Sequence, residues 1–348
     1  MASTPIDDRE FDALRELSAA LGSDPLRTQG AGGNTSIKRD GVMWIKASGT
    51  WLADALAHDI MTPVLLEPLR KAITEGDHRA AAAVDFVDAQ LNANGLRPSI
   101  ETSVHAIMPW PVVVHIHCVN TIALAVRRDG ESLVRERLRA DADVKLAFVP
   151  YRKPGLPLAH AISERLTKDT NVFILANHGL VVAGETIAEV ADRIARVCEA
   201  LSAPARRPPQ ADIDKLASII EATDYRKPQD PATHAVALDP KSLAIARLGS
   251  LYPDHVVFLG TGLAEGSVDG GRLRAPPEGL RPPMMIALPG LGVVLHRSTS
   301  KNAEAMAQCL ADVAARIPEE APIRVLTDAE EQELMNWEAE AYRQTIGR

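Results

Sequence analysis

The sequence has few aromatic residues, few cysteines and no excess of positive charge. Aromatic side chains make up 4% of the 348 residues, and the formal net charge is −8, so the composition offers no general basic face for nucleic acid. Donors for an anionic substrate must therefore be gathered locally. The three cysteines are odd in number and lie far apart without Cys-x-x-Cys spacing, which argues against a disulfide framework and fits a reducing cytoplasm.

Long apolar runs are also lacking. No window approaches 18 uninterrupted apolar residues, and the first residues carry acids where a signal peptide has a basic and then an apolar stretch. We therefore expect neither export nor membrane insertion. A hydrophobic content of 46% is still ample for a buried core, and the length exceeds one average domain.

Helical and β patterns alternate through the first 200 residues. Apolar residues at helical spacing near the start are followed by Gly22, which we expect to end a first helix. The glycine-rich turn at 30–34 leads into a hairpin with an Asp40-Gly41 turn. Residues 79–93 are expected to be helical, and a later helix should place Glu101 and His105 on one face.

Three further strand regions follow, at 112–119, at 145–151 and on both sides of Asn177-His178-Gly179. A helix from Thr186 to about Leu201 closes this half, and residues 203–210 have the composition of a linker. We place a boundary there, between a domain of residues 1–205 and a second domain of residues 211–348. A hairpin-plus-helix pattern recurs faintly at 284–317, with Pro289 about where the first copy has His178.

Chemistry-bearing residues concentrate in the first half. His115 and His117 are two apart in a strand and project from one face, as a chelating pair would. Many such pairs are only hydrogen-bonded polar residues, so a third ligand is required. His178 is the candidate, because it lies in a tight turn before Gly179, where an imidazole can reach a neighbouring strand. A water-facing hairpin histidine is the simpler interpretation of His178.

A carboxylate and several small polar residues complete the candidate site. Glu101 can transfer protons beside a metal that polarises substrate oxygens, although a solvated helix glutamate is the commoner case. The GGNTS turn at 32–36 offers backbone N–H groups and hydroxyls that suit a phosphate. Ser48, with Lys38 and Lys46 in the same hairpin, offers further donors.

These motifs, in this order, resemble the class II aldolase/adducin family. The resemblance covers residues 8–205 and rests on GGNTS, KASGT, PSIETSVH, VVVHIH and NHGLVVAG. Beyond the linker, YPDHVVFLG, PGLGVV and LMNWEAEAY resemble the second part of the aldolase region in bifunctional rhamnulose-phosphate aldolase/dehydrogenase proteins.

The resemblance implies a role for each matching position. His115, His117 and His178 correspond to zinc ligands, and Glu101 to the acid/base carboxylate. Tyr151 corresponds to a tyrosine that reaches a neighbouring subunit's site and protonates the leaving oxygen. The positions that hold substrate phosphate are Asn34, Thr35, Ser48, Gly49 and Ser99. Ile100 stands where the family usually has a second serine, which removes one phosphate donor.

The resemblance also implies an architecture and a reaction. We expect a layered α-β-α domain with a largely antiparallel central sheet, a smaller α/β C-terminal domain and a homo-oligomer, with a tetramer favoured. The expected reaction is zinc-dependent cleavage of a small ketose 1-phosphate, such as rhamnulose or fuculose phosphate, to dihydroxyacetone phosphate and an aldehyde.

Two alternatives remain open, and a third is disfavoured. Epimerases, dehydratases and decarboxylases of the family use the same metal site, and adducins use the fold for interaction without the metal. A dehydrogenase is disfavoured, because GAGGN precedes a hairpin rather than a helix and lacks Gly-x-Gly-x-x-Gly spacing.

Overall fold

The central feature of the molecule is a mixed sheet. The structure is a computed structural model that describes residues 8–276 and 282–335, and in these ranges seven strands join in the order β3-β2-β1-β4-β7-β6-β5. The strands are β1 (Asn34–Arg39), β2 (Val42–Lys46), β3 (Met61–Leu65), β4 (Val112–Ile116), β5 (Leu146–Val149), β6 (Val172–Leu175) and β7 (Gly179–Gly184). Neighbours run antiparallel except β5 and β6, which are parallel. The predicted largely antiparallel α/β sheet is confirmed.

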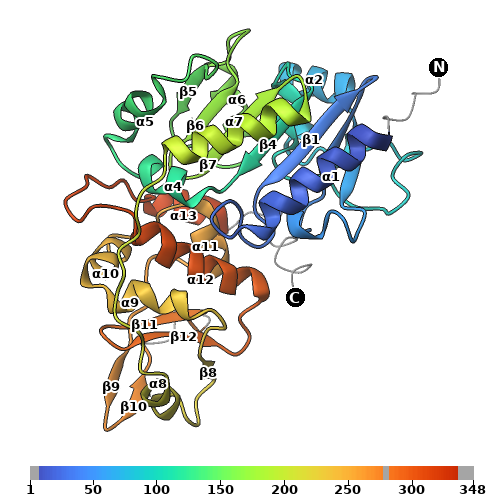
Figure 1. Ribbon diagram of the computed structural model, residues 1–348. Coiled ribbons are helices and arrows are strands. Elements are labelled where there is room, and N and C mark those ends of the chain that lie inside the picture. Colours follow the sequence, from blue (N-terminus) through green and yellow to red (C-terminus); the bar gives the residue numbers. More distant parts are fainter. Residues whose placement is uncertain (1–7, 277–281, 336–348) are drawn as a thin grey trace.

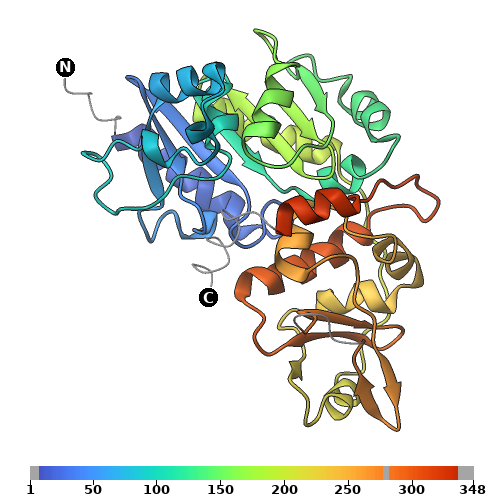
Figure 2. The ribbon, with the colours of Figure 1, turned by 180° about the vertical axis from the view of Figure 1, so that it is seen from behind.

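Helices cover both faces of this sheet (Figures 1 and 2). One face carries α1 (Asp8–Ser23) and α7 (Ile187–Ala200), and the other carries α2 (Leu66–Glu75), α3 (Thr102–Ile107) and α6 (Leu156–Ser163). Alternation along β4 divides the core: Val112 and Val114 pack with α1 and α7, whereas Val113 packs with α3 and α6. The result is the expected three-layer arrangement.

The first hairpin forms as predicted, but the first helix does not end at Gly22. The strands β1 and β2 pair on either side of Asp40-Gly41, and both turn residues have positive φ. The helix α1 continues to Ser23. A Cβ at position 22 would lie 2.0 Å from the backbone nitrogen of Ala53, so this glycine permits close packing rather than stopping the helix.

The predicted helix over 79–93 is wrong. The chain there forms two short 3-10 turns, η2 (His78–Ala81) and η3 (Val84–Phe86). Between them Ala83 takes a positive φ of 54°, which a continuous right-handed helix does not allow. Val87 then bridges to Val64 and the Asp88 N–H donates to the Pro63 carbonyl, so pairing with β3 overrides the helical propensity of the alanines.

The C-terminal part, residues 211–335, has its own three-stranded sheet, β11-β12-β8. The strands of this sheet are β8 (Tyr225–Arg226), β11 (Met285–Leu288) and β12 (Gly292–His296). A separate antiparallel pair is formed by β9 (Ser267–Asp269) and β10 (Arg272–Arg274). The helices of the C-terminal part are α8 (Ile213–Ile219), η4 (Pro231–His234), α9 (Ala235–Leu238), α10 (Pro240–Ala246), α11 (Pro253–Leu259), α12 (Lys301–Ala314) and α13 (Asp328–Met335).

This part packs against the end of the first sheet. Val119 and Ile122 of α4 (Val119–Ala125) share one apolar core with residues of α10, α11 and α12. The helix α5 (Gly130–Leu138) follows α4 in the chain. Figure 1 shows α11, α12 and α13 beneath the first sheet, at the end where α4 lies.

The faint repeat corresponds to the same local structure. In both copies a three-residue turn joins two strands, β6 to β7 and β11 to β12, and a helix follows, α7 or α12. The N–H of His178 donates to the Leu175 carbonyl, and the N–H of Leu291 donates to that of Leu288. Leu291, not Pro289 as the sequence suggested, therefore occupies the place of His178.

The remaining expectations concern the linker, the cysteines and membrane insertion. No helix or strand lies between α7 and α8, where the linker was placed. Cys118, Cys198 and Cys309 are buried free thiols. Within the described ranges, no helix combines the length and apolarity needed to cross a bilayer. Of the motif LMNWEAEAY, the residues from Asn336 onward lie outside the described chain.

Candidate metal centre

Three buried imidazoles meet at one end of the central sheet. His115 lies in β4, His117 follows that strand, and His178 lies in the turn between β6 and β7. Because β4 and β7 are neighbours, the turn brings His178 beside the other two. The ring centroids are 4.8 to 5.2 Å apart, and one potential ligand atom from each residue lies within 4.8 Å of the others.

The neighbours of the rings indicate which nitrogens point inward. His115 Nδ1 lies 3.0 Å from the Leu180 carbonyl, which requires a proton on that nitrogen. His117 Nδ1 lies 3.1 Å from a carboxylate oxygen of Asp254, which favours a proton there as well. Both Nε2 atoms are then lone-pair acceptors, and they face each other at 3.0 Å. Two opposed lone pairs at this distance repel unless a proton or a metal ion lies between them.

This donor set fits a divalent metal. Zinc with Zn–N bonds of about 2.0–2.1 Å in tetrahedral geometry holds its ligand nitrogens about 3.3 Å apart. Burial lowers the pKa of His178 to about 3 and lowers the pKa of His115, and in both cases it outweighs the opposing effect of Glu101. Neutral imidazoles are the form that binds a metal.

Glu101 is the carboxylate beside this cluster. Its Oε2 lies 3.3 Å from His115 Nε2, and its Oε1 lies 3.5 Å from His178 Nε2. Burial alone would raise the pKa of Glu101, but attraction to the three histidines and the Asn34 hydrogen bond lower it to about 2. Oε1 accepts no hydrogen bond from another described residue, so an ionised oxygen is available next to the metal ligands.

A hydrogen-bond chain fixes the position of this carboxylate. Asn34 Nδ2 donates to Glu101 Oε2 at 2.9 Å and to Ser99 Oγ at 3.1 Å. The other amide atom of Asn34, Oδ1, contacts His105 Nε2, and His105 Nδ1 lies 2.7 Å from Ser36 Oγ. Glu101 and His105 therefore share one side, as their spacing predicted. The helix itself begins one residue later, because Glu101 is the N-cap of α3.

The predicted phosphate-binding residues fall into two groups. Asn34, Ser48, Gly49 and Ser99 lie close together, because Ala47 bridges to Pro98 and the Ser99 N–H donates to the Lys46 carbonyl. The hydroxyl of Ser48 is buried with no partner among the described residues. The hydroxyl of Thr35, by contrast, contacts Ser18 Oγ of α1 at 2.7 Å, so its side chain lies on the other face of the sheet.

The two lysines of the first hairpin donate hydrogen bonds to backbone carbonyls. Lys38 Nζ donates to the carbonyls of Met108 and Trp110, and burial lowers its pKa well below the usual range. Lys46 Nζ donates to the Ala31 carbonyl at 2.9 Å and so fastens the glycine-rich turn. The Nζ of Lys38 is thus committed to carbonyls after α3 rather than to the turn that was expected to bind an anion.

Tyr151 is not brought to the histidines. Its ring is buried with Val256, Leu326 and Leu334 of the C-terminal part. The Arg324 guanidinium lies over the ring, 5.0 Å from the centroid, and burial raises the pKa of the phenol. Within one chain Tyr151 packs under α13, and its role as a proton donor to a neighbouring subunit stays a prediction.

Sequence reasoning missed Asp254. This residue lies in the first turn of α11, in the C-terminal part, and its carboxylate contacts His117 in a buried environment. No local pattern marks it, because an acid in the first helical turn is common for reasons of helix stability alone. Only the packing of the two parts brings it to the candidate ligands.

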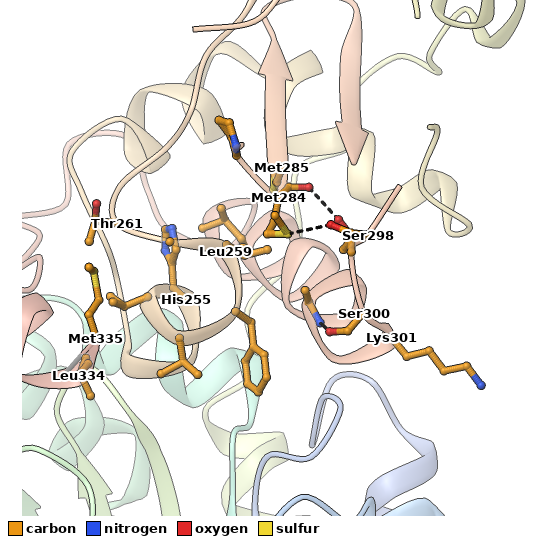
Figure 3. Close-up of a pocket in the computed structure, with 18 of the residues that line it drawn as sticks. His255, Leu259, Thr261, Met284, Met285, Ser298, Ser300, Lys301, Leu334 and Met335 are labelled. Carbon is orange, nitrogen blue, oxygen red and sulfur yellow. Dashed lines mark hydrogen bonds between the residues drawn. The ribbon is translucent and has the colours of Figure 1, made fainter. Parts of the chain in front are cut away.

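A cleft of ≈ 2160 Å³ lies between the two parts. Figure 3 shows one wall of it, with Ser298, Ser300 and Lys301 on one side and His255 and Thr261 on the other. On the N-terminal side the described lining includes Gly49 and Thr50, but none of the three histidines. Of the predicted phosphate-binding residues, the cleft therefore reaches Gly49.

The first part of the chain matches a known family. Residues 14–203 match the model described as Class II Aldolase and Adducin N-terminal domain. A Bacillus subtilis protein named "Uncharacterized oxidoreductase YuxG" is 30% identical over 181 residues, which cover 49% of this chain and 26% of that protein. This chain thus matches about a quarter of the length of its curated relative.

Two solved structures are similar to part of this chain. The N-terminal class II aldolase domain of a conserved protein from Thermoplasma acidophilum is 26% identical with a TM-score of 0.48, and the match covers 58% of this chain and 95% of that one. The L-fuculose-1-phosphate aldolase from Thermus thermophilus is 17% identical with a TM-score of 0.39, covering 56% and 93%.

Proposed function

This chain belongs to the class II aldolase and adducin family, and on that premise we propose that it is a zinc-dependent aldolase. Its substrate is a small ketose 1-phosphate of the rhamnulose or fuculose type, which it cleaves to dihydroxyacetone phosphate and an aldehyde. The observation that carries the proposal is the buried group of His115, His117 and His178 with Glu101 beside it. An adducin-like interaction role would not need these four residues together.

The residues have distinct roles in this mechanism. The three histidines hold the metal, which when bound supplies a Lewis acid that draws electrons from the substrate carbonyl. Glu101, ionised at neutral pH, accepts a proton from the substrate and returns it after the carbon–carbon bond breaks. Asn34 holds Glu101 in place through its amide.

The phosphate is assigned to the end of the first hairpin. Ser48 supplies a buried hydroxyl without a partner among described residues, and Ser99 and the Gly49 backbone lie beside it. Ile100 offers no hydroxyl, so this pocket has fewer donors than the family pattern. The cleft between the two parts supports the assignment, because its described lining includes Gly49.

Three further proposals accompany this function. Residues 1–205 act as the metal-binding domain and residues 211–348 as an accessory domain. The chain forms a homo-tetramer, in which the Tyr151 phenol donates a hydrogen bond at a neighbouring site to the oxygen that leaves as the aldehyde carbonyl. The enzyme works in the cytoplasm, which the three free thiols support.

Metal content and product release test the proposal together. The full chain, stripped with a chelator and reloaded with zinc, is expected to bind one equivalent and to release dihydroxyacetone phosphate from at least one of a panel of ketose 1-phosphates. His115→Ala should abolish both properties. His160→Ala, which removes an exposed histidine of α6, is the matched control and should keep both.

The other outcomes discriminate between the alternatives. Zinc without product release would favour an epimerase, dehydratase or decarboxylase that uses the same residues. A protein that binds no divalent metal would overturn the catalytic proposal in favour of an interaction role.

A further inference from the structure

A carboxylate from outside the family match touches one of the candidate metal ligands. The match ends at residue 203, whereas Asp254 lies about fifty residues further on, in α11. Its Oδ2 is 3.1 Å from His117 Nδ1, and the two side chains are 5% and 8% exposed. A buried carboxylate against a buried imidazole is costly to desolvate, so this contact calls for a specific explanation.

The backbone around Asp254 is held firmly. Pro253 occupies the first turn of α11, and every residue from Pro253 to Phe258 is buried. His255 Nε2 contacts the Gly262 carbonyl at 2.8 Å, and the Gly262 N–H donates to Ser250 Oγ, also at 2.8 Å. The Asp254 side chain is therefore presented from a rigid turn, as a group that positions another residue must be.

The N-terminal part makes room for this contact. A Cβ at Gly32 would lie 2.8 Å from His117 Nδ1 and 3.2 Å from Asp254 Oδ2. A side chain at position 32 would push into both groups. The first glycine of the GGNTS motif thus permits the carboxylate to approach the imidazole.

The same segment is tied to the turn that carries the third ligand. Asn177, next to His178, donates through Nδ2 to the Leu251 carbonyl at 2.8 Å and to the Arg324 carbonyl at 2.7 Å. Arg324 Nη1 donates back to Asn177 Oδ1 at 3.0 Å. The chain around residues 251–254 therefore contacts His117 directly and reaches His178 through its neighbour.

A contact of this kind has a known chemical effect on a metal ligand. A carboxylate at Nδ1 keeps the proton on that nitrogen, fixes the plane of the ring and makes Nε2 a better donor. In this structure Nε2 of His117 is the atom that faces His115 Nε2 at 3.0 Å. Asp254 therefore contacts Nδ1 of His117 and leaves Nε2, on the opposite side of the ring, to face the proposed metal.

We propose that Asp254 is a positioning residue of the metal centre, so that the C-terminal part completes a site whose ligands all come from the N-terminal part. The proposal rests on the metal-binding role of the histidines that the proposed function includes. It does not depend on which sugar phosphate is the substrate or on which reaction follows.

Zinc affinity of the full chain tests this role. Asp254→Asn keeps the shape of the side chain and removes its charge, and it is expected to weaken zinc binding by about 10- to 100-fold in competition with a chromophoric chelator. Asp239→Asn is the matched control. It removes a carboxylate of the C-terminal part that caps α10 and pairs with Arg206, so it should lower stability while leaving zinc affinity unchanged.

A second measurement uses the unaltered protein. In zinc-loaded protein with ¹⁵N-labelled histidine, the shifts of His117 should show metal at Nε2 and a proton at Nδ1. This result does not require that an Asp254 variant folds. Metal at Nδ1 of His117 would overturn the proposal, because that nitrogen is the one assigned to Asp254.

The outcomes separate this inference from the proposed function. Wild-type zinc affinity in Asp254→Asn would overturn the positioning role and leave the aldolase proposal intact. Weakened affinity in that variant, with no dihydroxyacetone phosphate released by the wild type, would support the positioning role and refute the aldolase. Failure of the wild type to bind zinc would overturn both.

Discussion

Two turns in this molecule have similar backbone conformations but different surroundings. The turn 176–178 joins β6 to β7, and the turn 289–291 joins β11 to β12. In each, the central residue has positive φ, 53° at Asn177 and 71° at Gly290. Its N–H donates to a helix-terminal region, to the Ala125 carbonyl in one copy and to the Ala237 carbonyl in the other.

The difference lies in what surrounds each turn. The first turn is buried under the C-terminal part and ends in His178, which meets two other imidazoles. In the second, Pro289 and Gly290 are exposed and Leu291 packs in a small apolar cluster. A hairpin-plus-helix unit supplies a backbone frame, and a site arises only where other elements bring chemical groups to it.

The largest effect is expected when the histidine of the first turn is replaced by the leucine found at the same place in the second turn. His178→Leu should retain the fold, because Leu291 occupies the same backbone position in the other copy. It should lower zinc affinity and kcat/KM by more than about 100-fold, because a ligand is lost rather than reoriented. Metal analysis, steady-state kinetics and circular dichroism check this result. The reciprocal Leu291→His should bind no additional zinc, and a gain of metal there would show that the turn alone makes a site.

The central residue of the first turn is predicted to link the two parts. Asn177→Gly tolerates the positive φ but removes the hydrogen bonds to Leu251 and Arg324, so the free energy of unfolding should fall by about 2–3 kcal/mol. Asn177→Ala should lose about 1 kcal/mol more, because alanine is strained at this φ. Urea unfolding of the metal-free protein measures both. Equal stability of the alanine variant and the wild type would contradict the link.

In the exposed turn at 289–291, a substitution at Gly290 should lower stability only through backbone strain. A Cβ at Gly290 meets nothing within 4 Å, so the only penalty in Gly290→Ala is the positive φ, about 1 kcal/mol. Zinc affinity should not change. A loss well above this value in chemical denaturation would mean that the second turn has contacts comparable to those of Asn177.

The smallest expected losses of stability come from removing the N-cap hydroxyls of α7 and α12, the helices that follow the two hairpins. Thr186 accepts the Glu189 N–H at the start of α7, and Ser300 accepts the Ala303 N–H at the start of α12. Thr186→Ala and Ser300→Ala should each cost about 1 kcal/mol of stability. Thermal unfolding of the two variants compares the units directly. A loss at only one position would show that the repeated units differ in local stability as well as in surroundings.

Local signals account for the elements that sequence reasoning placed correctly. Asp40-Gly41 marked the first hairpin because both residues tolerate positive φ, and Thr186 marked the start of α7 because its hydroxyl caps the helix. The error at 79–93 has a non-local cause, since Val87 pairs with Val64 and Ala83 adopts a conformation that its own side chain does not favour. The prediction that α1 ends at Gly22 was wrong for the same reason. A residue without a side chain is needed at this position because the backbone of Ala53 packs against it.

The sequence by itself determined the chemistry available at the site: two histidines on one side of a strand, a third in a tight turn, and a carboxylate in a segment predicted to be helical. Their spacing follows from strand and helix periodicity, which is local. Tertiary structure decided where those groups meet and what else reaches them. It turned Thr35 toward α1, buried Tyr151 beneath α13 and brought Asp254 to His117. These outcomes depend on packing between segments far apart in the chain, and no local pattern of residue types encodes such a distance.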